Sequence, residues 1–143
     1  MLNFDDKKFE EKTLAREEIF SGKIFHVVKD VVSLHDGQES FRELVFHKGG
    51  TAIAPVHNNK MILVGQYRKA LEKFIFEIPA GKLEKGEEKD PKAAALRELE
   101  EETGYLAQDL TEITAFYGTP GFSSEKTYVY FSSNLTKVEH PKP

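Results

Sequence analysis

A single helix with clear start and stop signals, set in an otherwise strand-like chain, is the feature that most limits the fold. Asp90-Pro91 supplies the start, an N-cap acid followed by proline at the first helical position, and Gly104 supplies the stop. The segments on both sides have the alternation and the turn residues of strands. This order of elements predicts a mixed α/β (α+β) fold in which the helix packs on a sheet.

The part of the chain before the helix contains several predicted strands. Residues 24–34 and 41–47 form two of them, and Asp36-Gly37 suits the tight hairpin turn between them. Residues 10–20 form either a third strand or a short helix. Residues 51–56 are expected to pair with residues 61–67 across a turn at 57–60, and residues 74–79 form a further apolar run.

Two more strands are predicted after the helix, at residues 113–118 and 127–132, with a Pro-Gly loop at 119–125 between them. Earlier in the chain, Gly49-Gly50 interrupts the strand pattern, so we expect a domain boundary there. It separates a small antiparallel strand domain at residues 1–48 from a second domain at residues 49–143. A chain of 143 residues is long enough for one complete hydrophobic core with a small appendage.

Three glutamates crowd one strip of the predicted helix. Glu98 and Glu102 stand one turn apart, and Glu101 flanks them. Like charges at this spacing repel each other, and the helix dipole also disfavours anions near the C-terminal end. A divalent cation reverses both penalties, and an all-oxygen ligand set favours Mg²⁺ or Mn²⁺. A glutamate run is by itself more often a solvated helix face, so the metal interpretation depends on the surrounding motif.

The surrounding residues supply that motif. Residues 81–87 and 97–105 together resemble the Nudix box, a loop-helix-loop with a glycine, a glutamate and an Arg-Glu-apolar-x-Glu-Glu-x-Gly-apolar run. The second half matches at every specified position. The first half has two extra residues around 88–90, which leaves the role of Glu87 open. Residues 66–68, 76–81 and 119–126 resemble the ADP-ribose pyrophosphatase branch of that family.

The resemblance implies a Nudix α/β/α sandwich with a mixed sheet, and an N-terminal strand domain that exchanges between the subunits of a homodimer. Its metal ligands would be the backbone carbonyl of Ala80 and three carboxylates, and the helix spacing independently supports the carboxylates, which are Glu98, Glu101 and Glu102. The resemblance also implies a further strand and a closing helix after Phe131. Residues 132–143 offer little length for both, so this C-terminal element is expected to be shortened or missing.

Four other residues have a candidate role beside a plainer one. Arg97 would orient the acids, or it forms an ordinary ion pair with Glu101 one turn later. Glu125 would activate or position the attacking water, or it is a solvated loop acid. Arg68 would bind a phosphate or ribose, or it lies at the surface at a strand end. Glu77 faces either the metal site or solvent.

The resemblance implies Mg²⁺-dependent hydrolysis of ADP-ribose to AMP and ribose 5-phosphate. The first alternative is another nucleoside diphosphate derivative as substrate, such as a nucleotide sugar or a dinucleotide polyphosphate, because the box fixes the metal and not the leaving group. The second is a non-catalytic nucleotide-binding module that regulates a partner. Neither the five histidines nor Ser123 and Ser124 show the spacing of a zinc site or of a serine nucleophile.

The composition of the chain limits which binding partners and which cellular compartment are expected. A net charge of -4 argues against binding to nucleic-acid polymers. The apolar runs are far shorter than a membrane span, and the N-terminus lacks the pattern of a signal peptide, so a cytoplasmic location is expected. The absence of cysteine excludes disulfides, thiolate nucleophiles and Cys-ligated metal sites.

Overall fold

The computed structural model describes residues 5–139, except the side chain of Asp6. Contacts divide the chain into two compact units. Unit 1 comprises Met1–His47 and Thr119–Glu125, and unit 2 comprises Lys48–Gly118 and Lys126–Pro143. None of the helices in residues 5–139 has the length and apolar character that a bilayer-spanning segment requires.

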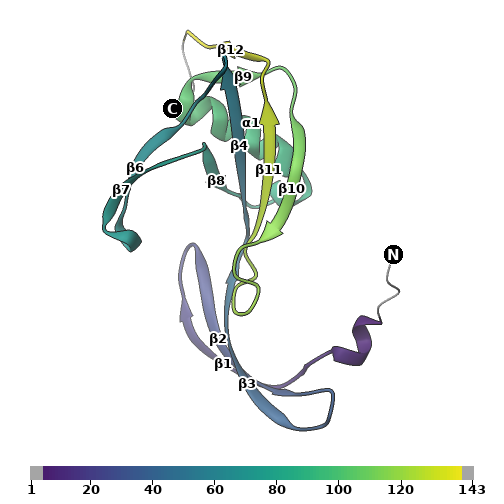
Figure 1. Cartoon of the computed structure of the whole chain (residues 1–143). Helices are drawn as coiled ribbons and strands as arrows, with labels where there is room; N and C mark the ends of the chain where they lie inside the picture. The colour runs from purple at the N-terminus through teal and green to yellow at the C-terminus, as the bar shows by residue number, and fades with distance from the viewer. Residues whose placement is uncertain (1–4, 140–143) are drawn as a thin grey trace. The chain divides into compact units, whose positions relative to one another are not determined.

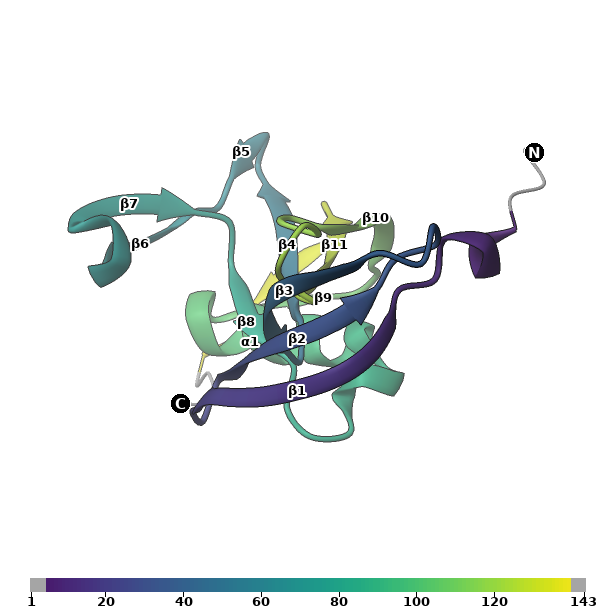
Figure 2. The ribbon, with the colours of Figure 1, turned by 90° about the horizontal axis from the view of Figure 1, so that it is seen from below.

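Unit 1 is an antiparallel three-stranded sheet that follows the short 3-10 helix η1 (Asp6–Phe9). Its strand order is β1-β2-β3, with bounds β1 (Lys12–Ser21), β2 (Phe25–Ser33) and β3 (Glu39–His47). The open choice for residues 10–20 is therefore settled as a strand. Gly37 adopts a φ of 83° in the predicted turn between β2 and β3, a conformation that favours glycine. Figure 2 shows the three strands side by side.

The loop Thr119–Glu125 belongs to unit 1 because it runs beside the end of β3. The Val45 N–H donates to the Phe122 carbonyl at 2.8 Å, and the Ser124 N–H donates to the Val45 carbonyl at 2.9 Å. The Ser124 hydroxyl also accepts from the His47 N–H at 3.0 Å. These bonds attach a segment from late in the chain to a strand from its first third.

Unit 2 is built around β4 (Gly50–His57), whose residues are mostly buried because it has neighbours on both edges. On one edge β11 (Lys126–Ser132) pairs with it in parallel, and β10 (Thr111–Tyr117) pairs antiparallel with β11. On the other edge lie β8 (Ala80–Lys82) and β5 (Lys60–Met61), both antiparallel to β4. The sheet is therefore mixed, as predicted.

The predicted pairing of residues 51–56 with residues 61–67 is wrong in its second half. Only β5 pairs with β4, whereas β6 (Val64–Arg68) forms a hairpin with β7 (Lys73–Glu77) across the 3-10 turn η2 (Lys69–Leu71). The reason is competition for one sheet edge, because β8 occupies the stretch of β4 from Gly50 to Ala52 that a longer hairpin would need.

Three short strands were absent from the prediction. One is β8, and the other two are β9 (Tyr105–Ala107) and β12 (Leu135–Lys137), which pair antiparallel with each other. The element expected after Phe131 to be shortened or missing includes the three-residue strand β12. Residues 5–139 contain one α-helix and several sheets, so the fold class is mixed α+β.

The helix α1 (Pro91–Thr103) follows the 3-10 turn η3 (Glu87–Lys89) and covers one face of the sheet (Figure 1). Its predicted caps are present: the Asp90 side chain accepts from the Ala93 N–H, and Gly104 adopts a φ of 69°. The buried face of the helix packs on the inner face of β4 and β11. The resulting core contains Ile53, Ala95, Leu99, Leu110, Tyr130 and Leu135.

Candidate active site

The helix and β8 together place the acidic strip at the edge of unit 2. Glu98 follows the fully buried Ala94 and Ala95 by four and three positions, and Glu102 follows the buried Leu99 by three, so the helical repeat places both acids at the margin of the buried face of α1. The Ala80 N–H at the start of β8 donates to Glu102 Oε2 at 3.0 Å. The predicted ligand residues Ala80 and Glu102 are therefore neighbours in space although 22 positions separate them.

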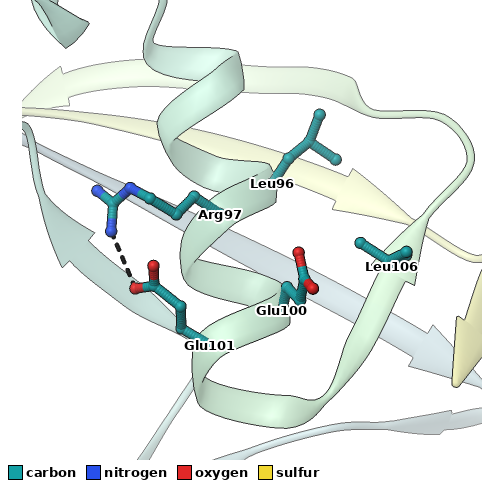
Figure 3. Close-up of a pocket in the computed structure, with 5 residues that line it drawn as sticks. All are labelled: Leu96, Arg97, Glu100, Glu101 and Leu106. Carbon is teal, nitrogen blue, oxygen red and sulfur yellow. Dashed lines mark hydrogen bonds and ion pairs between the residues drawn. The ribbon is translucent and has the colours of Figure 1, made fainter. Parts of the chain in front are cut away.

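Arg97 hydrogen-bonds to two of the helix acids. Its Nη1 donates to Glu98 Oε1 at 2.9 Å and to Glu101 Oε2 at 3.0 Å. Figure 3 shows the guanidinium pointing to the Glu101 carboxylate, while Glu100 projects from another side of the helix toward Leu106. A hollow of about 340 Å³ lies on this side of α1, lined by Leu96, Arg97, Glu100, Glu101 and Leu106.

Glu87, whose role the sequence left open, belongs to this cluster. Arg97 grips both of its oxygens, with Nε and Nη2 each at 3.1 Å. Hydrogen bonds from Arg97 and from the Glu84 N–H lower the pKa of Glu87, and its bond to Arg97 in turn raises the pKa of that guanidinium. The two extra residues are absorbed in η3 and in the residues before α1, so the insertion does not separate Glu87 from Arg97.

Glu102 differs electrostatically from the other acids. Its partial burial raises its pKa, and the negative charge of Glu98 raises it further. The Ala80 N–H and the charge of Arg68 act in the opposite direction, while Glu77 adds to the rise. The balance of these effects leaves the pKa of Glu102 above its usual value, with burial as the largest cause.

Gly81 allows the Glu98 carboxylate to lie directly on β8. A Cβ built on Gly81 would stand 1.9 Å from Glu98 Cδ and 2.0 and 2.4 Å from its two oxygens. No side chain could share that space with the carboxylate. The glycine of the motif is therefore explained by the close approach of Glu98 and not by the backbone conformation.

These residues fit a hard divalent cation by their chemistry. One oxygen of each of Glu98, Glu101 and Glu102 has no hydrogen-bond partner in residues 5–139. The donors are flexible carboxylates whose mutual repulsion a cation would relieve. Within the described residues, no group of three acidic or histidine side chains is arranged closely enough to hold a metal ion. Instead, Arg97 bonds to Glu98 and the Ala80 N–H bonds to Glu102.

The β6–β7 hairpin brings the two candidate substrate residues next to Glu102. Arg68 Nε donates to Glu77 Oε2 at 2.7 Å, and both side chains act on the pKa of Glu102 through their charges. Of the two sequence alternatives for Glu77, the one facing the acids agrees with this arrangement. The Arg68 guanidinium keeps donors available for an anion because its Nε carries the bond to Glu77.

Glu125, the remaining candidate, belongs to unit 1, whereas the helix acids belong to unit 2. Its Oε1 lies 3.6 Å from His47 Nδ1, the end residue of β3. No role was predicted for His47, because a lone strand histidine carries no spacing signal. Only the pairing of the loop with β3 brings the two residues together.

The chain is similar to known proteins. The profile of the NUDIX domain matches residues 47–143. The chain is 52% identical over 137 residues to the ADP-ribose pyrophosphatase of Bacillus subtilis (strain 168), covering 95% of this chain and 73% of that protein. It is 50% identical over 135 residues to the methanol dehydrogenase activator of Bacillus methanolicus, covering 94% and 72%. The crystal structure of an ADP compounds hydrolase matches the fold with a TM-score of 0.79 at 23% identity, covering 94% of this chain and 75% of that one.

Proposed function

Because the chain belongs to the Nudix family, we propose that it is a Mg²⁺-dependent pyrophosphohydrolase that converts ADP-ribose and water into AMP and ribose 5-phosphate. The observation that carries the proposal is the carboxylate cluster of α1, held by Arg97 and by the Ala80 N–H next to Gly81. The similarity to the Bacillus subtilis ADP-ribose pyrophosphatase supports the choice of substrate.

Glu98, Glu101 and Glu102, with the backbone carbonyl of Ala80, would hold the metal. Magnesium, when bound, neutralises the phosphate charge that otherwise repels an attacking water. Arg97 keeps the carboxylates in place through its bonds to Glu98 and Glu101, and it is itself held by Glu87.

The reaction itself needs one proton transfer and one phosphoryl transfer. Water forms a bond to one phosphorus of the diphosphate while the bond between that phosphorus and the bridging oxygen breaks, and the bridging oxygen leaves on the other phosphate. We assign Glu125 as the base that accepts the proton of the water, since a loop carboxylate can approach a bound substrate. Arg68, beside Glu77, would bind the phosphate or ribose through its free N–H groups.

The test is turnover of ADP-ribose with Mg²⁺ by the wild type and by Glu102→Gln, followed as release of AMP. Glutamine keeps an acceptor for the Ala80 N–H but carries no charge, so loss of turnover reports on the charge alone. Equal rates would remove Glu102 from the metal site. Parallel assays with nucleotide sugars and dinucleotide polyphosphates decide between ADP-ribose and the other diphosphate substrates.

A regulatory role is the second candidate, and the 50% identity to a protein named an activator of methanol dehydrogenase supports it. A pure binding module has little need of the three helix acids that are proposed as metal ligands, which favours hydrolysis. Calorimetry with ADP-ribose separates the two: binding without release of AMP would favour the regulatory role.

We further propose that the N-terminal domain, residues 1–48, pairs two chains into a homodimer. Every residue of β1 is exposed, and the exposed apolar side chains of unit 1 include Leu14 at 53%, Ile19 at 56% and Phe41 at 60%. Light scattering should give twice the chain mass for the wild type and the monomer mass for Ile19→Asp. Ile113→Asp, at an equally exposed residue of unit 2, is the control.

The cytoplasm is proposed as the compartment of the protein, and the absence of cysteine supports this proposal.

A further inference from the structure

The loop that carries Glu125 is attached to β3 through its backbone. The Val45 N–H donates to the Phe122 carbonyl at 2.8 Å, and the Ser124 N–H donates to the Val45 carbonyl at 2.9 Å. The Glu125 N–H donates to the Ser123 hydroxyl at 3.2 Å. All of these residues belong to unit 1, so the backbone of Glu125 has a defined place relative to the end of β3.

The last residue of β3, His47, contacts both Glu125 and the residue before it. His47 Nδ1 lies 3.6 Å from Glu125 Oε1. The Ser124 hydroxyl accepts from the His47 N–H at 3.0 Å and donates to the His47 carbonyl at 3.3 Å. The backbone of His47 and the side chain of Ser124 are thus joined by two hydrogen bonds, and the imidazole stands beside the carboxylate as a consequence of this local arrangement.

The two side chains differ in their freedom to move. The side chain of His47 is 11% exposed, whereas that of Glu125 is 50% exposed. An exposed glutamate samples several rotamers unless a contact restricts it. Among residues 5–139, His47 is the only polar partner of the Glu125 carboxylate. A partly exposed ion pair contributes little to folding stability, so the contact matters through the orientation that it gives to the carboxylate.

We propose that His47 is a positioning residue for Glu125: the imidazole attracts the carboxylate through Nδ1 and keeps it in the orientation in which it accepts the proton of the attacking water. The inference rests on the proposed role of Glu125 as the base. His47 neither takes that proton nor binds the substrate or the metal, and it acts through Glu125 alone. A base must lie within hydrogen-bond reach of the proton that it accepts, so a carboxylate with fewer orientations spends more time in the productive geometry.

The test compares two amides at position 47 in the turnover of ADP-ribose with Mg²⁺. The amide nitrogen of His47→Asn takes the place of Nδ1, whereas that of His47→Gln takes the place of the other ring nitrogen, Nε2. We expect kcat to fall about tenfold in His47→Gln, the lower end of the loss that follows when the partner of a functional group is removed. His47→Asn should recover most of this loss, and KM and the Mg²⁺ affinity from calorimetry should be unchanged in both variants. His35→Gln, at an exposed histidine of unit 1, is the control.

A double-mutant cycle with Glu125→Gln isolates the contact. His47→Gln should lower kcat little further in a protein that already carries Glu125→Gln, because the carboxylate that His47 positions is absent. Thermal unfolding shows whether each variant is folded, and His47→Leu, which also lacks a donor, takes the place of a glutamine variant that is not. A kcat for His47→Gln within about twofold of the wild type would overturn the proposal, and so would equal losses in the two amide variants, which would indicate packing. A Glu125→Gln protein with the kcat of the wild type would instead refute Glu125 as the base, and the proposal with it.

Discussion

Replacing Gly81 by alanine tests the close contact at the centre of the site. The added Cβ would lie 1.9 Å from Glu98 Cδ, whereas ordinary van der Waals contact begins at 3.4 Å, so the carboxylate must move by about 1.5 Å. The three nearest atoms all belong to this flexible side chain, and Gly81 is not in the left-handed region that favours glycine. The backbone can therefore accept alanine, and the change falls on Glu98.

The expected result is a large loss of activity with little loss of stability. A misplacement of about 1 Å in a catalytic group costs roughly 100-fold in rate, so kcat for ADP-ribose should fall by about that factor. The melting temperature should stay the same or rise, because alanine loses less backbone entropy on folding than glycine does. Gly118→Ala is the control, since a Cβ at Gly118 meets nothing within 4 Å.

A double-mutant cycle isolates the cause. If Gly81→Ala acts by moving Glu98, it should have little further effect on a protein that already carries Glu98→Gln, so the two losses should not add. Turnover of ADP-ribose and thermal unfolding are measured for the four proteins. A Gly81→Ala enzyme with a kcat within about threefold of the wild type, well below the loss expected from misplacement, would refute the reasoning.

Three further predictions concern other parts of the site. Because the pKa of Glu102 is raised in the folded state, the metal-free protein should lose stability as the pH rises from the usual carboxyl range through the raised pKa. Urea unfolding in the presence of a chelator should therefore show Glu102→Gln to be more stable than the wild type at pH 7, and this difference should vanish toward pH 4. Arg97→Lys should lower kcat/KM by about 10- to 100-fold in steady-state assays, because lysine cannot form two parallel hydrogen bonds to Glu87 while it also bonds to the helix acids. A kcat/KM equal to that of the wild type would contradict this prediction. Glu125→Gln should lower kcat by about 100-fold or more while calorimetry gives an unchanged Mg²⁺ affinity, because the proposed role of Glu125 is to accept a proton from the water and not to bind the metal. A parallel loss of Mg²⁺ binding would show that Glu125 is a metal ligand instead.

Local sequence signals determined the helix and the acidic strip. Asp90-Pro91 and Gly104 set the helix ends, since capping depends on residues a few positions apart. The helical repeat then places Glu98 and Glu102 on one side and Leu99 in the core. These features need no knowledge of distant parts of the chain, and for that reason the metal interpretation could be made from the sequence.

The tertiary structure decided which segments meet. Residues 61–67 have the alternation of one strand, yet β8 takes the edge of β4 and leaves β6 to pair with β7. Glu87 reaches Arg97 in spite of the insertion, and Glu125 meets His47 only because its loop pairs with β3. Strand pairing is a competition for edges between segments far apart in sequence, so periodicity shows that a strand exists but does not show its partner.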